Sequence, residues 1–325
     1  MNILINGLGN IGKTILSVIR EYKEILQVDK IYLLKNIKKE FEDYSFLENN
    51  FTEVYYSKEE IPINKIDFVF DCTTNSMACK NKDWYKKFLN LKGATAQGSE
   101  HDFGTSYMYG INHNDLINEK YFHVVSCNTH AILSTLKHFG GELKNIKEAD
   151  FVVVRRSEDL GNHERLVSAN VVSNHRSEKY GTHHAEDASN LLNQMRIKTP
   201  LFSSDITTPS QLMHALRFNI KLKLIRNQHY NTLIGKTKVF DSNIIFEHGR
   251  RYGLSGRLYY HSIIVSNNLH IEKNRVIGWV FVPQEGNTIL STLATLVFKK
   301  FEEDVAKKIM NKIVDENSIK TSVIY

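Results

Sequence analysis

The feature that most restricts the fold of this chain is a glycine pattern close to its N-terminus. An apolar run at residues 3–5 leads into Asn6-Gly7-Leu8-Gly9-Asn10-Ile11-Gly12, and helical periodicity follows. A strand, a Gly-x-Gly-x-x-Gly turn and a helix in this order suit the pyrophosphate of a dinucleotide, because the glycines permit a tight turn and a close approach of backbone to phosphate. The alternative is a turn with only a structural role. The pattern predicts a dinucleotide site, formed by Gly7, Gly9, Asn10, Ile11 and Gly12.

The first half of the chain alternates short apolar runs with helical stretches. Strands are predicted at residues 2–5, 30–34, 67–72 and 123–126. Strands separated by helices form a doubly wound parallel sheet. We therefore expect an α/β protein whose N-terminal Rossmann domain spans residues 1–126.

The second half of the chain has a different pattern of apolar residues. Longer strand-like runs appear at residues 150–154, 218–224 and 258–265, with less regular helix between them. They predict a second, α+β catalytic domain at residues 127–287, built on a mixed or antiparallel sheet. The tail keeps helical spacing, so we expect a long helix or a pair of helices at residues 288–325, packed back on the first domain.

The composition restricts the possible binding partners of the chain more than it restricts the fold. Lys and Arg total 42 against 36 Asp and Glu, a net charge of +6, and the lysines are scattered along the chain. This charge suits small anions such as phosphorylated metabolites, and no nucleic-acid partner is expected. No run approaches the ~18 apolar residues of a spanning helix, and no signal-peptide pattern is visible. We therefore expect no membrane contact and a cytoplasmic location.

The chain has three cysteines, Cys72, Cys79 and Cys127. An odd number without CxxC spacing argues against a disulfide framework and against a zinc site, so no metal is expected. Cys127 ends an apolar run and precedes a helical stretch. A thiol at a helix N-terminus has a lowered pKa, and backbone N–H groups there can stabilise an oxyanion. Cys127 is therefore the candidate nucleophile, whereas Cys72 and Cys79 read as buried apolar residues.

A lysine cluster bears on the cofactor. Enzymes that select NAD usually place an acidic residue at the end of the second strand, where it binds the ribose diol. Here Lys35 and Asn36 follow that strand, with Lys38 and Lys39 beyond. This predicts that NADP is accepted at least as well as NAD. The alternative is a run of solvated lysines.

Residues 124–129, Val-Val-Ser-Cys-Asn-Thr, resemble the active-site segment of the archaeal-type (type II) glyceraldehyde-3-phosphate dehydrogenases. Further segments resemble the same family in the same order along the chain. They are residues 6–13, Lys80-Asn81-Lys82, Gln97-Gly98-Ser99-Glu100, Arg155-Arg156, and His183-His184 with Asp187. The resemblance therefore covers nearly the whole chain.

The resemblance implies oxidation of glyceraldehyde 3-phosphate, or a closely related phosphorylated aldehyde, through a thioester on Cys127. NAD or NADP would accept the hydride, and inorganic phosphate would release an acyl phosphate, as in glycolysis. It also implies a homotetramer and a contact of Gly98 with the cofactor. Residues implied to bind substrate or phosphate are Asn128, Thr129, His130, Arg155, Arg156, His183 and His184.

Three positions depart from the family pattern. His130 stands where the family has a small hydroxyl residue. Leu216 replaces the second histidine of a His-x-His pair whose first member is His214, so the general base is His214, His130 or another group. Asn287 is the substitute near the C-terminus for contacting the nicotinamide amide.

These departures leave two alternatives to the main prediction. The first is a family member diverted to a different phosphorylated or phosphonate aldehyde in a biosynthetic pathway. The second is a non-catalytic paralogue that binds the cofactor and serves as a regulatory or RNA-binding protein.

Overall fold

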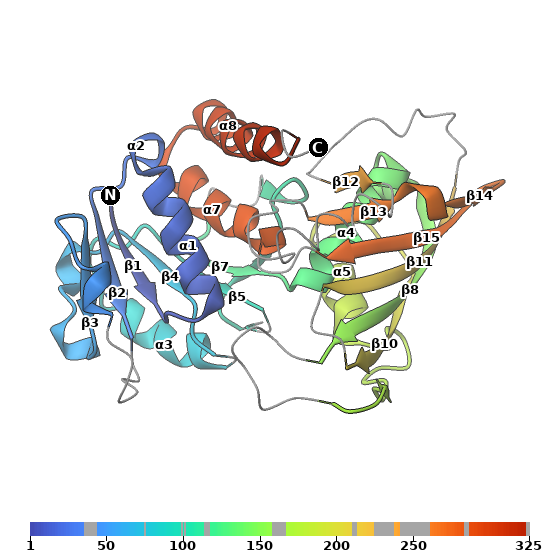
Figure 1. Ribbon diagram of the computed structural model, residues 1–325, viewed down its shortest axis with the longest axis horizontal. Coiled ribbons are helices and arrows are strands. Elements are labelled where there is room, and N and C mark those ends of the chain that lie inside the picture. The colour runs from blue at the N-terminus through green and yellow to red at the C-terminus, as the bar shows by residue number, and fades with distance from the viewer. Residues whose placement is uncertain are drawn as a thin grey trace. The chain divides into compact units, whose positions relative to one another are not determined.

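The computed structural model divides into two compact units (Figure 1). Unit 1 consists of Met1–Tyr107, His113–Val125 and Ile289–Tyr325, and unit 2 consists of Met108–Asn112 and Ser126–Thr288. The described residues are 1–35, 44–74, 76–98, 100, 102–113, 118–157, 167–209, 213–223, 237–240, 261–282 and 286–322. Side chains are not described at residues 237–240, 266, 286 and 315–322.

Unit 1 contains a parallel sheet with the strand order β3-β2-β1-β4-β5-β7-β6. The strands are β1 (Asn2–Asn6), β2 (Lys30–Leu34), β3 (Thr52–Tyr55), β4 (Phe68–Asp71), β5 (Gly93–Gln97), β6 (Thr105–Tyr107) and β7 (Tyr121–Val124). β1 lies between β2 and β4, and Ile3, Leu4 and Ile5 are fully buried there. Continuous apolar burial is typical of a parallel strand covered on both faces. The predicted Rossmann-like sheet is confirmed.

The helices of unit 1 follow the strands. They are α1 (Asn10–Glu21), α2 (Lys23–Leu26), α3 (Met77–Tyr85), α7 (Gly286–Lys300) and α8 (Glu303–Ser322), and the predicted C-terminal helix is the pair α7 and α8. The hydroxyl of Thr295 on α7 lies 2.6 Å from the hydroxyl of Thr95 on β5. No helix within the described residues is long and apolar enough to cross a membrane.

Unit 2 contains a mixed sheet with the order β12-β13-β15-β11-β8-β10-β9, and β14 pairs with β15. The strands are β8 (Ile146–Arg156), β9 (Val171–Val172), β10 (Leu201–Thr208), β11 (His214–Leu222), β12 (Thr237–Phe240), β13 (Ser262–Val265), β14 (His270–Glu272) and β15 (Arg275–Val282). β8 is parallel to β10 and antiparallel to β11. The predicted mixed sheet is confirmed, although β8 and β11 begin earlier than expected. Residues 251–260, which include the start of the strand predicted at 258–265, lie outside the described residues.

The two faces of this sheet differ. Helices α4 (Cys127–Gly140) and α5 (His183–Gln194) cover one face, where Phe139 of α4 packs 5.3 Å from Phe218 of β11, measured between ring centroids. Alternate residues of a strand point to opposite faces. On the other face Val152, Arg217 and Trp279 are neighbours in register and are only half-buried.

Candidate active site

The glycine turn after β1 has the geometry of a phosphate-binding turn. Gly7 has φ of +100°, and a Cβ there would lie 2.6 Å from the carbonyl oxygen of Cys72. A Cβ on Gly12 would lie 2.0 Å from the carbonyl oxygen of Gly7, whereas a Cβ on Gly9 would meet nothing within 4 Å. Gly7 and Gly12 therefore serve packing, and Gly9 leaves open space at the start of α1.

The N-terminus of α1 suits an anion. It has no side-chain cap hydrogen bond and no acidic residue in its first turn. The first N–H groups of a helix carry partial positive charge, and they bind phosphate when no side chain occupies them. Asn10 and Ile11 form this first turn, so the residues present fit a dinucleotide.

Two lysine side chains, one of them at the carboxyl end of β2, contact the same aromatic ring. The Nζ atoms of Lys13 and Lys35 lie 5.6 Å and 5.5 Å from the ring centroid of Tyr44, which is buried. Such cation–π contacts hold the two ammonium groups near each other. Asn36, Lys38 and Lys39, also predicted to act here, lie outside the described residues.

Burial raises the thiol pKa of two of the three cysteines. Burial raises the pKa of the Cys72 thiol well above its ordinary value, with Asp71 as a smaller cause. Burial and a hydrogen bond to Glu100 raise the pKa of the Cys79 thiol. Both thiols therefore stay protonated at neutral pH. Cys127 is half-buried and is the first residue of α4.

The helix that begins with Cys127 is capped by the residue before it. Ser126 has extended backbone, and its Oγ accepts a hydrogen bond from the backbone N–H of Thr129 at 3.4 Å. A serine N-cap fixes the first turn of a helix. Cys127 therefore sits at the positive end of a capped, 14-residue helix.

His184, the second residue of α5, lies against this first turn. Its Nε2 is 3.2 Å from Nδ2 of Asn128, and its Nδ1 is 3.4 Å from Oγ of Ser126. The His183 and His184 ring centroids are 3.9 Å apart. Burial lowers the pKa of His184 well below its ordinary value, and the charges of His183 and Arg155 contribute further. His184 is therefore a neutral imidazole.

The pleat of β8 separates the two predicted arginines. Arg155 follows the alternation of Phe151 and Val153 on the helix-covered face, and its Nη1 lies 3.4 Å from the buried carboxylate of Asp205. Arg156 takes the opposite parity. Consecutive strand residues point to opposite faces, and Arg156 is 9% exposed. Joint binding of phosphate by the two arginines stays a prediction. Arg176 is instead the second arginine whose charge acts on His184.

A hydrogen bond determines the tautomer of His214. Its Nδ1 accepts the backbone N–H of Arg156 at 3.1 Å, so in the neutral ring the proton is on Nε2. His214 therefore presents a donor at Nε2. Leu216, two residues along β11, shares its face and is fully buried.

His130 has the opposite tautomer. Its Nδ1 lies 3.1 Å from the carbonyl oxygen of Ser126, which only accepts, so Nδ1 carries the proton and Nε2 has the lone pair. The ring is fully buried, 5.0 Å from that of His261. His261 in turn lies between two carbonyl oxygens, those of Asn287 at 2.9 Å and Tyr109 at 3.1 Å.

Asn287 connects this histidine pair to the first turn of α4. Its Nδ2 donates to the carbonyl oxygen of Cys127 at 2.8 Å and lies 3.3 Å from that of His261. Its Oδ1 is buried and has no hydrogen-bond partner among the described residues. One amide oxygen therefore remains for a ligand next to Cys127.

The relatives found by comparison with known proteins share the name glyceraldehyde-3-phosphate dehydrogenase. The chain is 28% identical to glyceraldehyde-3-phosphate dehydrogenase of Methanobacterium bryantii over 237 residues, which cover 67% of each chain. It is 22% identical over 339 residues to the same-named protein of Methanothermobacter thermautotrophicus, covering 95% of this chain and 97% of the relative. The chain is a distant relative of the archaeal glyceraldehyde-3-phosphate dehydrogenases. No protein-family model matches it.

The resemblance to the archaeal glyceraldehyde-3-phosphate dehydrogenases is thus confirmed, and two of its segments have structural roles in unit 1. Nδ2 of Asn81 and the hydroxyl of Tyr85 donate to Oδ2 of Asp71 at 2.9 Å and 2.5 Å, and Asn6 donates to Tyr85 at 2.7 Å. This buried network links the end of β1, just before the glycine turn, to the end of β4.

The Gln97–Glu100 segment of the same resemblance supports α3. The Glu100 carboxylate accepts the backbone N–H groups of Ser76 and Cys79 at the start of that helix. Gly98, predicted to contact the cofactor, has φ of +82°, and its carbonyl oxygen lies 2.6 Å from Nε2 of His123. Ser99 lies outside the described residues.

Asp205, Arg176 and His261 were not predicted from the sequence. Asp205 had a signal, since it is an acidic residue at a position of β10 that strand alternation places on the covered face. Arg176 and His261 had none, because neither belongs to a motif.

Proposed function

We propose that this chain is a phosphorylating aldehyde dehydrogenase that oxidises glyceraldehyde 3-phosphate, or a closely related phosphorylated aldehyde, with NAD(P). The observation that carries the proposal is the arrangement around Cys127 in unit 2. A half-buried thiol opens a capped helix, and Arg155, His183, His184 and His214 gather around the start of α5. The names of the archaeal relatives supply the reaction class.

Unit 1 has the residues to hold the cofactor. Gly9, Asn10, Ile11 and Gly12 would bind the pyrophosphate, and Lys13 and Lys35 would lie near the adenosine ribose, where they favour a 2′-phosphate. The bound nicotinamide supplies a hydride acceptor. In unit 2 the Oδ1 of Asn287 would accept a hydrogen bond from the nicotinamide amide.

Cys127 carries the covalent chemistry in this proposal. Its sulfur bonds to the aldehyde carbon, and the carbonyl oxygen takes up a proton to give a thiohemiacetal. Loss of hydride from carbon and of the hydroxyl proton to a base leaves a thioester. An oxygen of inorganic phosphate then attacks the thioester carbon, the C–S bond breaks, and an acyl phosphate leaves with the thiolate restored.

Neighbouring residues bind and orient the substrate. N–H groups of the first turn of α4 stabilise negative charge on the substrate oxygen. The helix already orients these groups, so they need not rearrange when the charge develops. Arg155, fixed by Asp205, binds phosphate together with Arg176 and a ring donor of His183. His184, whose two ring nitrogens face Ser126 and Asn128, orients the first turn of α4. Nε2–H of His214 adds a further donor.

The experiment that tests the proposal measures NADPH and NADH formation from glyceraldehyde 3-phosphate with and without inorganic phosphate. We expect turnover that requires phosphate, and kcat/KM with NADP⁺ at least equal to that with NAD⁺, because Lys13 and Lys35 attract the additional phosphate. Cofactor binding without turnover would contradict this substrate. A clear preference for NAD⁺ would contradict the role of the lysines alone.

His130 favours one alternative substrate class. The family's small hydroxyl residue is replaced here by a buried imidazole, and Leu216 removes a second imidazole from β11. Both changes alter the volume and the donors near Cys127. If glyceraldehyde 3-phosphate is not oxidised, other phosphorylated aldehydes and phosphonate aldehydes are the next substrates to assay.

His130 also leads to a prediction about the proton acceptor. Its Nε2 has a lone pair, whereas that of His214 carries the proton, so His130 is the better base of the two. We expect His130→Ser to lower kcat about 100-fold and to remove the acidic limb of the kcat–pH profile.

The matched variant is His214→Asn. It should keep the acidic limb and chiefly raise KM, because His214 acts as a donor. A His130→Ser enzyme that retains both its kcat and its acidic limb would assign the base to another group.

We also propose a cytoplasmic homo-oligomer. The face of the unit 2 sheet that no described helix covers carries half-buried Val152, Ile277, Trp279 and Phe281. Apolar side chains of this size on one face favour burial against another copy of the chain.

A further inference from the structure

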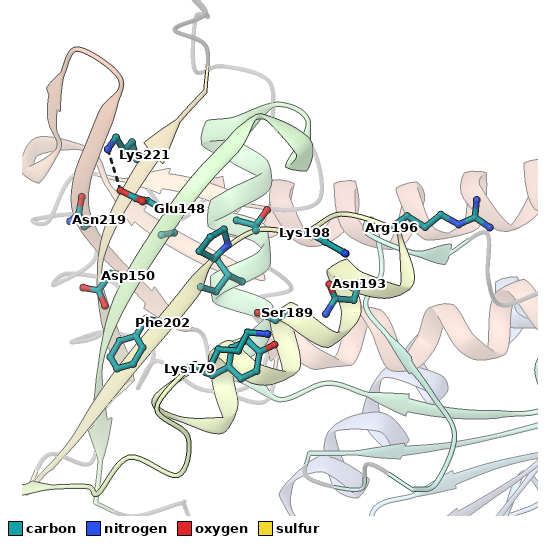
Figure 2. A pocket seen from close by; sticks show the side chains of 15 residues that line it. Glu148, Asp150, Lys179, Ser189, Asn193, Arg196, Lys198, Phe202, Asn219 and Lys221 are labelled. Atoms are coloured by element: carbon teal, nitrogen blue, oxygen red, sulfur yellow. Dashed lines mark hydrogen bonds and ion pairs between the residues drawn. The ribbon is translucent and has the colours of Figure 1, made fainter.

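A cavity of about 920 Å³ lies in unit 2 away from Cys127 (Figure 2). It takes Glu148, Ala149 and Asp150 from the beginning of β8, whereas Arg155 is at the end of that strand. Five residues of strand span about 17 Å. From α5 it takes Ser189 and Asn193, which are five and nine residues, or about 8 and 13 Å, beyond His184. The cavity is therefore separate from the proposed catalytic site.

Two buried hydroxyl groups in this cavity lack partners. Ser189 is 4% exposed, and its Oγ has no hydrogen-bond partner among the described residues. Oγ1 of Thr199, which also lines the cavity, is buried and equally unpartnered within that part of the chain. Buried polar groups in proteins are nearly always hydrogen-bonded. Two such groups in one cavity indicate a polar ligand.

Positive charge collects on the helix side of the cavity. Figure 2 shows Lys179 and Lys198 there with Ser189 and Asn193, while Glu148 and Asp150 lie on the sheet side. Glu148 is already paired with Lys221 at 3.3 Å. Among the described residues neither Lys179 nor Lys198 belongs to an ion pair, and the Tyr180 ring holds Nζ of Lys179 at 4.8 Å. The helix side is therefore suited to an anion.

The cavity also has apolar walls, and Arg196 and Asn219 are its remaining polar lining residues. Tyr180, Pro200, Leu201 and Phe202 form walls next to the polar groups. A concave site of this volume that combines apolar walls with polar groups is typical of small-molecule binding. The ligand that matches has one strongly anionic end and an apolar or aromatic body.

We propose that this cavity binds a small organic phosphate. Lys179, Lys198 and the two hydroxyl groups of Ser189 and Thr199 hold the phosphoryl oxygens, and the organic part packs against Tyr180 and Phe202. A phosphoryl group fits better than a carboxylate because its three terminal oxygens can accept from four donors at once. The site goes beyond the proposed dehydrogenase function and does not depend on it.

Calorimetric titration of the full-length protein with phenyl phosphate tests the proposal. We expect the double variant Lys179→Glu/Lys198→Glu to bind at least tenfold more weakly than the wild type. Ser189→Ala should weaken binding severalfold, and benzoate should bind the wild type at least tenfold more weakly than phenyl phosphate.

Two control variants separate the cavity from other effects. Lys147→Glu makes the same charge change on β8 outside the cavity and should alter the affinity less than twofold. Arg155→Gln changes the proposed catalytic site and should leave cavity binding intact. The proposal is overturned if the wild type does not bind phenyl phosphate, if the double variant binds as the wild type does, or if Arg155→Gln abolishes binding. Dehydrogenase assays of the double variant report separately on the proposed function.

Discussion

Replacement of Cys127 by alanine should lower phosphate-dependent NADPH formation at least about 10⁴-fold. In the proposed mechanism the sulfur forms the bond that makes hydride loss possible, and removing a covalent nucleophile costs factors of this size or larger. Cofactor affinity should change less than twofold, since the glycine turn belongs to unit 1 and Cys127 to unit 2. Steady-state kinetics and a cofactor titration of the same preparation measure both quantities.

Cys79 provides the matched control. Burial and Glu100 raise the pKa of its thiol, so it should take no part in catalysis, and Cys79→Ser should keep at least half of the activity. Mass spectrometry after brief iodoacetamide treatment at pH 7 should find the label on Cys127 and not on Cys72 or Cys79. Substantial turnover by Cys127→Ala would exclude the thioester mechanism.

The fold was predictable because its signals are local. Alternation of apolar runs with helical periodicity predicted the parallel sheet of unit 1 and placed β1, β2, β4 and β7 within about two residues. The strands β3, β5 and β6 were not predicted. The glycine turn was equally clear, since Gly7 and Gly12 avoid clashes with backbone atoms of Cys72 and Gly7. Unit 2 was predicted more coarsely, because β8 and β11 contain polar ends that blur the apolar runs.

The site was less predictable because its decisive contacts join distant segments. No sequence pattern shows that Asp205 fixes Arg155, or that Asn287 reaches the carbonyl of Cys127 across 160 positions. The adjacent arginines looked equivalent in the sequence, yet the pleat sends Arg155 and Arg156 to opposite faces. The tautomers of His130 and His214 depend on backbone groups that only the fold identifies.

Replacement of Gly12 by alanine should unfold the cofactor turn, whereas the same change at Gly9 should not. A Cβ on Gly12 would lie 2.0 Å from the backbone carbonyl of Gly7, which cannot move without disturbing β1. We expect Gly12→Ala to lower the free energy of unfolding by about 3 kcal/mol. Gly9 has φ of −73° and open space around it, so Gly9→Ala should change that free energy by less than about 0.5 kcal/mol.

Gly9→Ala should instead act on cofactor binding. If the open space at Gly9 receives the pyrophosphate, the alanine methyl group occupies it, and the dissociation constant for NADPH should rise at least tenfold in a protein that is otherwise as stable as the wild type. Urea unfolding and NADPH fluorescence titration of the two variants measure stability and affinity separately. A Gly9→Ala protein that binds NADPH normally would mean that the turn has only a structural role. A loss of affinity without a loss of stability requires a ligand at that position, because no described atom of the protein lies close enough to account for it.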